Sequence, residues 1–190
     1  MCLFGQVKPI SIAIVCFHQE EVNSINRLLV EIVCTCLEKF RESIGEIKQV
    51  NCYSSSNEEA VSSQIDILRS SQIIIFITPI WNWSVPWQVK RLLDNWITYK
   101  GYSDEESEGT SERRCSYIVQ TLGGKNREFF YKSNFTVADY LIYVFRRIGF
   151  KHIEGVCIEE LGNGKEKKLT GDALHEITNK VKLSLENFMK

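Results

Sequence analysis

The residues best suited to hold a ligand lie in the segment TPIWNWSVPWQVKRLLDNW, which spans positions 78 to 96 and follows the apolar run QIIIFI. Trp81 and Trp83 offer flat apolar faces, while Asn82 and the backbone amides of the turn offer hydrogen-bond donors and acceptors. This combination suits a planar heteroaromatic ring with polar edges, such as a flavin or a purine. The residue types alone equally allow both indoles to cap the core or to fill an interface.

A second candidate is the stretch TLGG at positions 121 to 124, where a strand-like run ends in two glycines. Glycine permits positive φ and close approach of a ligand to the backbone, although most glycine pairs only turn the chain. Its value as a site depends on whether the fold brings it to the same place as the tryptophan turn.

Whether the TLGG stretch and the tryptophan turn come together depends on the order of strands and helices along the chain. Apolar, β-branched runs predict strands, and apolar residues at helical spacing predict the helices between them. The expected strands cover residues 10–17, 47–53, 72–78, 115–121 and 152–158. The expected helices cover residues 23–42, a segment capped by Ser56 or Asn57, a segment with Pro86 in its first turn, 134–148 with Gly149 at its end, and 170–188.

Strands that alternate with helices predict an α/β fold, in which a parallel sheet is covered by helices on both faces. With five strands, we expect the flavodoxin-like three-layer sandwich with strand order 2-1-3-4-5. In that order, ligands bind at the carboxyl ends of the strands, near the switch between strands one and three. Three loops should meet there, at residues 17–24, 78–85 and 121–126.

The composition predicts one globular domain over residues 1–190, with a solvated acidic loop at 102–114. The net charge of -1 shows no basic excess for nucleic acid. No apolar run reaches the roughly 18 residues that cross a bilayer, and the first residues lack the zones of a secretory signal. We therefore expect a cytoplasmic protein without membrane or nucleic-acid partners. The 7 cysteines follow no metal or redox spacing, so we expect structural thiols and neither disulfides nor a metal site.

The tryptophan segment resembles one in the flavodoxin-like NAD(P)H quinone and azo reductases, where proline, an apolar residue, an aromatic, asparagine and a second aromatic precede a helix. QTLGG is similar to the second flavin loop of that family, and YLIYVFRRIGFKHIEGVCIEELG is similar to its fourth helix and fifth strand. The resemblance covers about residues 72 to 162 and is most specific in its first motif.

The resemblance implies FMN as the cofactor, NAD(P)H as the hydride donor, and a quinone or azo compound as a small aromatic electron acceptor. It implies no catalytic side chain, because the flavin carries the chemistry, and it implies a homodimer. The cofactor-binding residues that it implies are Phe17, Asn23, Ser24, Ile25, Pro79, Ile80, Trp81, Asn82, Trp83, Thr121, Leu122, Gly123 and Gly124.

The loop after the first strand departs from the serine-rich phosphate turn of that family. It reads CFHQEEVNSINRLL, in which Asn23, Ser24 and the amides at the start of the helix can bind an anion. Glu20 and Glu21 place negative charge in the same loop. Two other functions therefore stay open: a non-catalytic flavodoxin-like module that has lost or weakened FMN binding and, ranked below it, an electron-transfer flavodoxin.

Overall fold

A parallel sheet forms the centre of the computed structural model, which describes residues 9–18, 24–54, 57–99, 114–122, 136–159, 161 and 171–189. Within these ranges the sheet has five strands in the order β2-β1-β3-β4-β5, and every neighbouring pair is parallel. The strands are β1 (Ile10–Cys16), β2 (Ile44–Asn51), β3 (Ile73–Pro79), β4 (Cys115–Thr121) and β5 (His152–Ile158). The flavodoxin-like strand order predicted from the sequence is confirmed.

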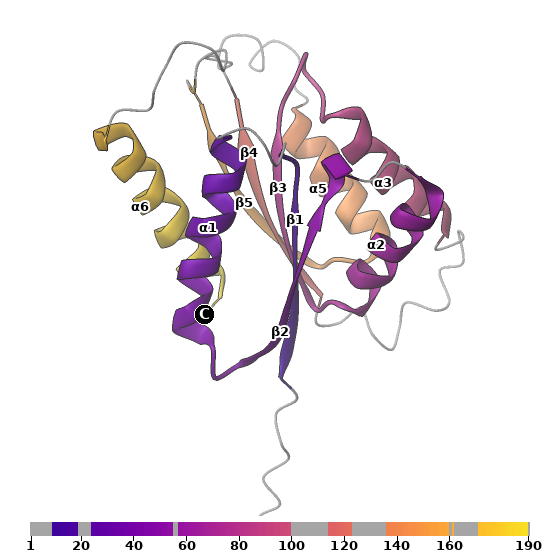
Figure 1. Ribbon diagram of the computed structural model, residues 1–190, viewed down its shortest axis with the longest axis horizontal. Helices are drawn as coiled ribbons and strands as arrows, with labels where there is room; N and C mark the ends of the chain where they lie inside the picture. The colour runs from indigo at the N-terminus through magenta and orange to yellow at the C-terminus, as the bar shows by residue number, and fades with distance from the viewer. Residues whose placement is uncertain are drawn as a thin grey trace, which may run out of the picture.

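Helices cover both faces of the sheet. Figure 1 shows α1 and α6 on one face and α2, α3 and α5 on the other, which gives the predicted three layers. The helices are α1 (Ile25–Leu37), α2 (Glu58–Ser70), α3 (Trp87–Tyr99), α5 (Val137–Ile148) and α6 (Gly171–Phe188), with short 3-10 turns η1 (Glu38–Phe40) and η2 (Cys52–Ser54).

Local sequence signals explain where several helices begin and end. Asn57, one of the two predicted caps, accepts a hydrogen bond from the Ala60 N–H at 2.8 Å and begins α2. Thr136 and Asp139 form a reciprocal capping box at the start of α5. Gly149 ends α5 as predicted, with a φ of 101° that favours glycine.

Two predicted elements have boundaries that are wrong by several residues. The second strand was expected at 47–53, but β2 begins at Ile44 and ends at Asn51. Gly45 and Glu46 carry no strand signal, yet this edge strand includes them because β1 pairs with it from Ile10 onwards. The first helix was expected to reach residue 42, whereas α1 ends at Leu37 and continues only as the 3-10 turn η1.

The alternating side chains of the strands fill two apolar cores. Ile12, Ile14, Ile75 and their neighbours pack against α1 and α6. The other core lies against α2, α3 and α5 and contains a contiguous aromatic cluster. The rings of Phe76, Trp96 and Phe150 each contact Phe145 edge-on, with centroids 5.3 to 6.0 Å apart. Both faces of the central strands are therefore buried, as their continuous apolar sequences predict.

Arg114 is buried although it ends the stretch that was expected to be solvated. Its guanidinium donates to the carbonyl oxygens of Leu68 at 2.7 Å, Arg69 at 3.0 Å and Ser71 at 3.3 Å, at the C-terminal end of α2. It also lies over the ring of Phe150, 5.0 Å from the centroid. Burial lowers the pKa of Arg114 from its ordinary value. The expected loop at 102–113 lies outside the described residues.

Cysteines in the described part of the chain are free thiols, at positions 16, 34, 36, 52, 115 and 157. Burial raises the pKa of Cys16 to about 12 and that of Cys157 to about 11. The pKa of Cys52 is also raised by burial. These thiols remain protonated at neutral pH, and a protonated thiol is a poor nucleophile.

Gly155 provides a test of the packing between β4 and β5. A Cβ at this position would lie 2.4 Å from the backbone oxygen of Ile118, so Gly155→Ala should lower the free energy of unfolding by about 1 to 3 kcal/mol. Gly171→Ala is the matched control, because a Cβ there has no neighbour within 4 Å. The control should be unchanged or more stable by up to about 1 kcal/mol in urea denaturation. Equal stability of the two variants would contradict the close approach of the strands.

Candidate functional site

The chain makes a two-residue turn directly after β3. The N–H of Trp81 donates to the carbonyl of Ser84, and the N–H of Ser84 donates back to that of Trp81, both at 2.9 Å. The two central residues have positive φ, 47° at Asn82 and 66° at Trp83, which is the pattern of a type I′ turn. Asparagine tolerates this region, but a bulky side chain such as tryptophan is an outlier there. The turn therefore holds Trp83 in a strained backbone conformation.

The turn exposes both of its indoles. Trp81 and Trp83 are each 53% exposed, and Asn82 between them is also exposed. Phe17, which directly follows β1, is buried and meets the Trp81 indole edge-on with centroids 5.0 Å apart. Two flat apolar surfaces thus lie beside polar backbone and side-chain groups at the carboxyl edge of β3, as a planar ring with polar edges requires.

A buried hydrogen-bond chain joins the ends of the strands around this turn. The hydroxyl of Thr121 donates to Asn26 Oδ1 at 3.0 Å, and Asn26 Nδ2 donates to the carbonyl of Phe17 at 2.9 Å. The N–H of Ile80 donates to the carbonyl of Thr121 at 2.8 Å. The ends of β1, β3 and β4 and the first turn of α1 are therefore held together at one place.

The start of α1 lies at the same edge and suits an anion. Ser24 caps the helix by accepting a hydrogen bond from the Arg27 N–H at 3.2 Å. The first turn of the helix carries no acidic residue that would offset the partial positive charge of its free amides. Ser24 and Ile25 are both partly exposed, which leaves this end of the helix accessible.

The structure divides the cofactor-binding residues predicted from the sequence into three groups. Those at the surface of the site are Ser24, Ile25, Ile80, Trp81, Asn82 and Trp83. Those that are buried are Phe17, Pro79, Thr121 and Leu122. Those that lie outside the described residues are Asn23, Gly123 and Gly124.

The buried group has structural partners. The side chain of Thr121 is used by Asn26, and the Leu122 N–H donates to the Ile158 carbonyl at 2.8 Å. These contacts make Thr121 and Leu122 part of the buried scaffold of the site.

Sequence reasoning missed Asn51, which is the last residue of β2, and Tyr53, which lies just after that strand. The ring of Tyr53 meets Phe17 edge-on with centroids 5.6 Å apart, and Asn51 hydrogen-bonds to the backbone of His18. The second strand was expected to run through Tyr53, so its end was not counted among the loops of the site. Its position beside β1 in the predicted order was the signal that could have found it.

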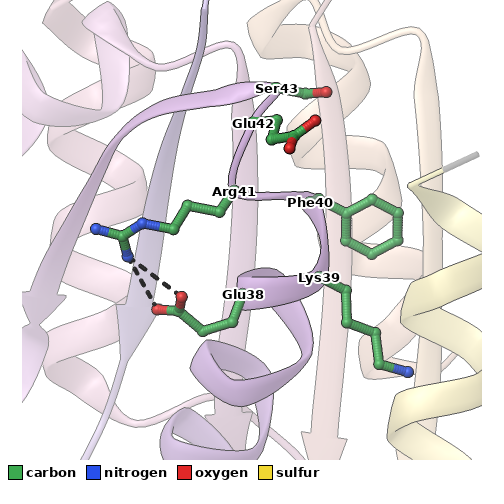
Figure 2. A pocket seen from close by; sticks show the side chains of 6 residues that line it. All are labelled: Glu38, Lys39, Phe40, Arg41, Glu42 and Ser43. Carbon is green, nitrogen blue, oxygen red and sulfur yellow. Dashed lines mark hydrogen bonds and ion pairs between the residues drawn. The ribbon is translucent and has the colours of Figure 1, made fainter.

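A surface hollow of about 620 Å³ lies at the opposite edge of the sheet. It is lined by the consecutive residues 38–43, which connect α1 to β2. Figure 2 shows Arg41 paired with Glu38, while Phe40 and Lys39 extend away from that pair. This connection faces the amino ends of the strands, where doubly wound sheets do not bind their ligands, so the tryptophan turn remains the better candidate.

Known proteins share this fold and this sequence pattern. A family model described as "Flavodoxin-like fold" matches residues 11–181, which is most of the chain. The chain belongs to this family. The resemblance stated from the tryptophan segment and the glycine loop is thereby confirmed.

Curated relatives carry names that specify a cofactor and a reaction. An "FMN-dependent NADH:quinone oxidoreductase 3" of Bacillus cereus is 28% identical over 112 residues, 57% of this chain and 53% of that protein. An "FMN-dependent NADH:quinone oxidoreductase 2" of the same species is 27% identical over 130 residues, 66% of this chain and 58% of that protein. The matched part of the chain thus spans just over half the length of these relatives.

Solved structures agree with the fold over nearly the whole chain. An FMN-dependent NADH-azoreductase from Bacillus anthracis, in complex with FMN, has a TM-score of 0.67 at 15% identity and covers 95% of this chain and 99% of that chain. An NAD(P)H:quinone oxidoreductase from Methanothermobacter marburgensis has a TM-score of 0.70 at 13% identity and covers 96% and 98%. At these identities the likeness establishes the fold.

Within the described residues no helix combines the length and the apolar character needed to span a membrane. In the same ranges no three side chains of His, Cys, Asp or Glu gather closely enough to hold a metal ion.

The strain at Trp83 gives a test of whether the turn is shaped for folding or for binding. Glycine is the ordinary residue at this position of a type I′ turn, so Trp83→Gly should leave the free energy of unfolding unchanged or raise it by about 1 kcal/mol. Trp81→Ala is the matched comparison, because it removes the edge-on contact with Phe17 and should lower stability by about 1 kcal/mol. Chemical denaturation of the protein without ligand measures both. A large loss of stability in Trp83→Gly would show that the indole is there for packing.

Proposed function

We propose that this protein is an FMN-dependent oxidoreductase that uses NAD(P)H to reduce quinones or azo compounds. The observation that carries the proposal is the Asn82–Trp83 turn, which holds two half-exposed indoles in a strained backbone at the ligand-binding edge of the sheet. Strain of this kind persists where it serves a ligand site, because packing alone would favour glycine. The names of the curated relatives and the FMN complex of a structural neighbour support FMN as the ligand.

The exposed residues fit the parts of FMN. Ile80, Trp81, Asn82 and Trp83 would hold the isoalloxazine ring, with apolar faces against the ring and polar groups at its edge. Ser24, Ile25 and the first-turn amides of α1 would hold the phosphate, together with Asn23 from the sequence-based prediction. Gly123 and Gly124 remain predicted contacts. FMN supplies the capacity to accept a hydride from a nicotinamide and to pass it to an acceptor.

The contribution of the protein itself is positioning. The Thr121–Asn26–Phe17 chain of hydrogen bonds fixes the strand ends, and the internal hydrogen bonds of the turn fix the indoles before a ligand arrives. A preorganised site binds with less loss of conformational entropy than a flexible one. We assign no catalytic side chain, in agreement with the resemblance.

We also propose a homodimer in the cytoplasm. Trp87 on α3 and Tyr143 on α5 are 66% and 62% exposed, on helices that contact each other through Lys90 and the Tyr140 ring. Large exposed aromatic side chains are enriched in protein interfaces.

The free thiols of the described residues fit a reducing compartment, which supports the proposed cytoplasmic location. The net charge of -1 supports the expectation that nucleic acid is not a partner.

FMN titration tests the cofactor. If Trp81 and Trp83 contact the ring, FMN should quench most of the fluorescence of these two tryptophans, whereas Trp87 and the buried Trp96 lie outside the turn. Trp81→Ala should weaken FMN binding about 2- to 12-fold, because ring stacking contributes roughly 0.5 to 1.5 kcal/mol. Trp87→Ala is the control variant, since it removes an exposed tryptophan outside the turn. Unchanged fluorescence at saturating FMN would contradict the ring site.

Steady-state kinetics tests the enzyme. FMN-loaded protein should oxidise NADH or NADPH in the presence of menadione, with parallel double-reciprocal plots, because donor and acceptor use the same flavin in turn. Free FMN at the same concentration is the control for uncatalysed transfer. Absence of turnover with both nucleotides, in protein that binds FMN, would favour the electron carrier. Absence of FMN binding would favour the non-catalytic module.

A further inference from the structure

The carboxamide of Asn51, the last residue of β2, is bound to two other segments of the backbone. Its Nδ2 donates to the carbonyl of His18 at 3.0 Å. Its Oδ1 accepts from the N–H of Tyr53 at 3.1 Å and from the N–H of His18 at a longer 3.4 Å. One side chain thus contacts both backbone groups of His18 and the backbone of Tyr53.

This arrangement extends the sheet beyond its last backbone pair. The pairing of β1 with β2 ends at Cys16 and Asn51. Past that point the Asn51 side chain binds the N–H and C=O of His18 as a neighbouring strand would, while Asn26 Nδ2 donates to the carbonyl of Phe17 at 2.9 Å. Two asparagines, from β2 and α1, therefore fix the backbone of Phe17 and His18.

The fixed segments carry the rings that support the tryptophan turn. Tyr53, Phe17 and Trp81 form a continuous row, with centroids 5.6 and 5.0 Å apart and interplanar angles of 75° and 88°. Phe17 is 3% exposed and lies between the other two rings, whereas Trp81 is 53% exposed. A half-exposed indole has many rotamers open to it, so the buried ring beneath it restricts which one it takes.

We infer that Asn51 is a positioning residue for the ligand ring. It fixes the backbones of His18 and Tyr53, the rings of Phe17 and Tyr53 follow, and these set the orientation of Trp81. The identity of the ligand as FMN rests on the proposed function, but the effect of Asn51 on Trp81 does not. The inference places the end of β2 in the site, although the sequence-based prediction included only the ends of β1, β3 and β4.

The first experiment uses the protein without ligand. The near-UV circular dichroism of Trp81 is obtained as the difference between wild type and Trp81→Phe, and the same difference is measured in an Asn51→Ala background. A fixed indole beside other aromatic rings gives a strong signal, so the Trp81 contribution should fall by at least half in Asn51→Ala. An unchanged Trp81 contribution would overturn the inference, whether or not the protein binds FMN.

Ser54→Ala is the matched control for this experiment. The Ser54 hydroxyl donates to the Asn51 backbone carbonyl at 3.1 Å, so its loss removes a neighbouring hydrogen bond and leaves the carboxamide intact. The Trp81 signal should persist in this variant, and its loss there would overturn the specific role of the carboxamide. Asn51→Asp keeps the acceptor oxygen and loses the donor to His18, so it gives a smaller change in a protein of nearly the same shape. If Asn51→Ala does not fold, the Trp81 contribution to the circular dichroism is measured in Asn51→Asp instead.

The second experiment is a double-mutant cycle on the dissociation constant of FMN. Asn51→Ala should raise this constant in the wild-type background by no more than about the 2- to 12-fold expected for Trp81→Ala, because it acts through the orientation of that indole. In the Trp81→Ala background the same change should have less than about a twofold effect, because a residue that acts through Trp81 has nothing left to position. Equal effects in both backgrounds would overturn the inference. Failure of wild-type protein to bind FMN would overturn the proposed function, and the dichroism would still decide the role of Asn51.

Discussion

The hydrogen bond between Thr121 and Asn26 is the constraint on which the geometry of the site depends. It joins residues 95 positions apart, at the end of β4 and in the first turn of α1, and both side chains are buried. Asn26 also donates a hydrogen bond to the Phe17 carbonyl, and the Thr121 carbonyl accepts one from the N–H of Ile80. The constraint therefore includes the residues that follow β1 and β3. A buried polar pair of this kind is costly to leave half satisfied, so these bonds hold the ends of β1, β3 and β4 and the start of α1 together.

The tryptophan turn combines rigidity with exposure. Its two internal hydrogen bonds and the buried Phe17 ring hold the backbone and one indole in place, and the positive φ at Trp83 places a second indole where most sequences would have glycine. Energy is therefore stored in the free protein at the point where a ligand would bind. The core beneath the sheet, in which Phe76 and Phe150 both pack against Phe145, is large enough to tolerate that cost.

The sequence predicted the elements that depend on local pattern and missed those that depend on distant pairs. The alternation of five strand-like runs with helical patterns predicted the parallel sheet with helices on both faces, and the Asn57 and Gly149 signals placed two helix ends. The left-handed backbone of Trp83 had no signal, because Asn-Trp is not the Asn-Gly pair that marks such a turn. Thr121 was named for the ligand although its hydroxyl faces Asn26, and a single sequence does not reveal which polar side chains meet in space.

Arg114 has a consequence for how the protein can vary. A buried guanidinium usually requires a carboxylate, but here the carbonyl oxygens at the end of α2 and the face of Phe150 take that place. The start of β4 is therefore anchored to the C-terminal end of α2 and to the core by groups that belong to the backbone and to an apolar ring. Because these contacts fix the chain at Arg114 itself, the register of β4 is set from this residue onwards, and the junction is a natural point for insertions that add a new surface to an unchanged site.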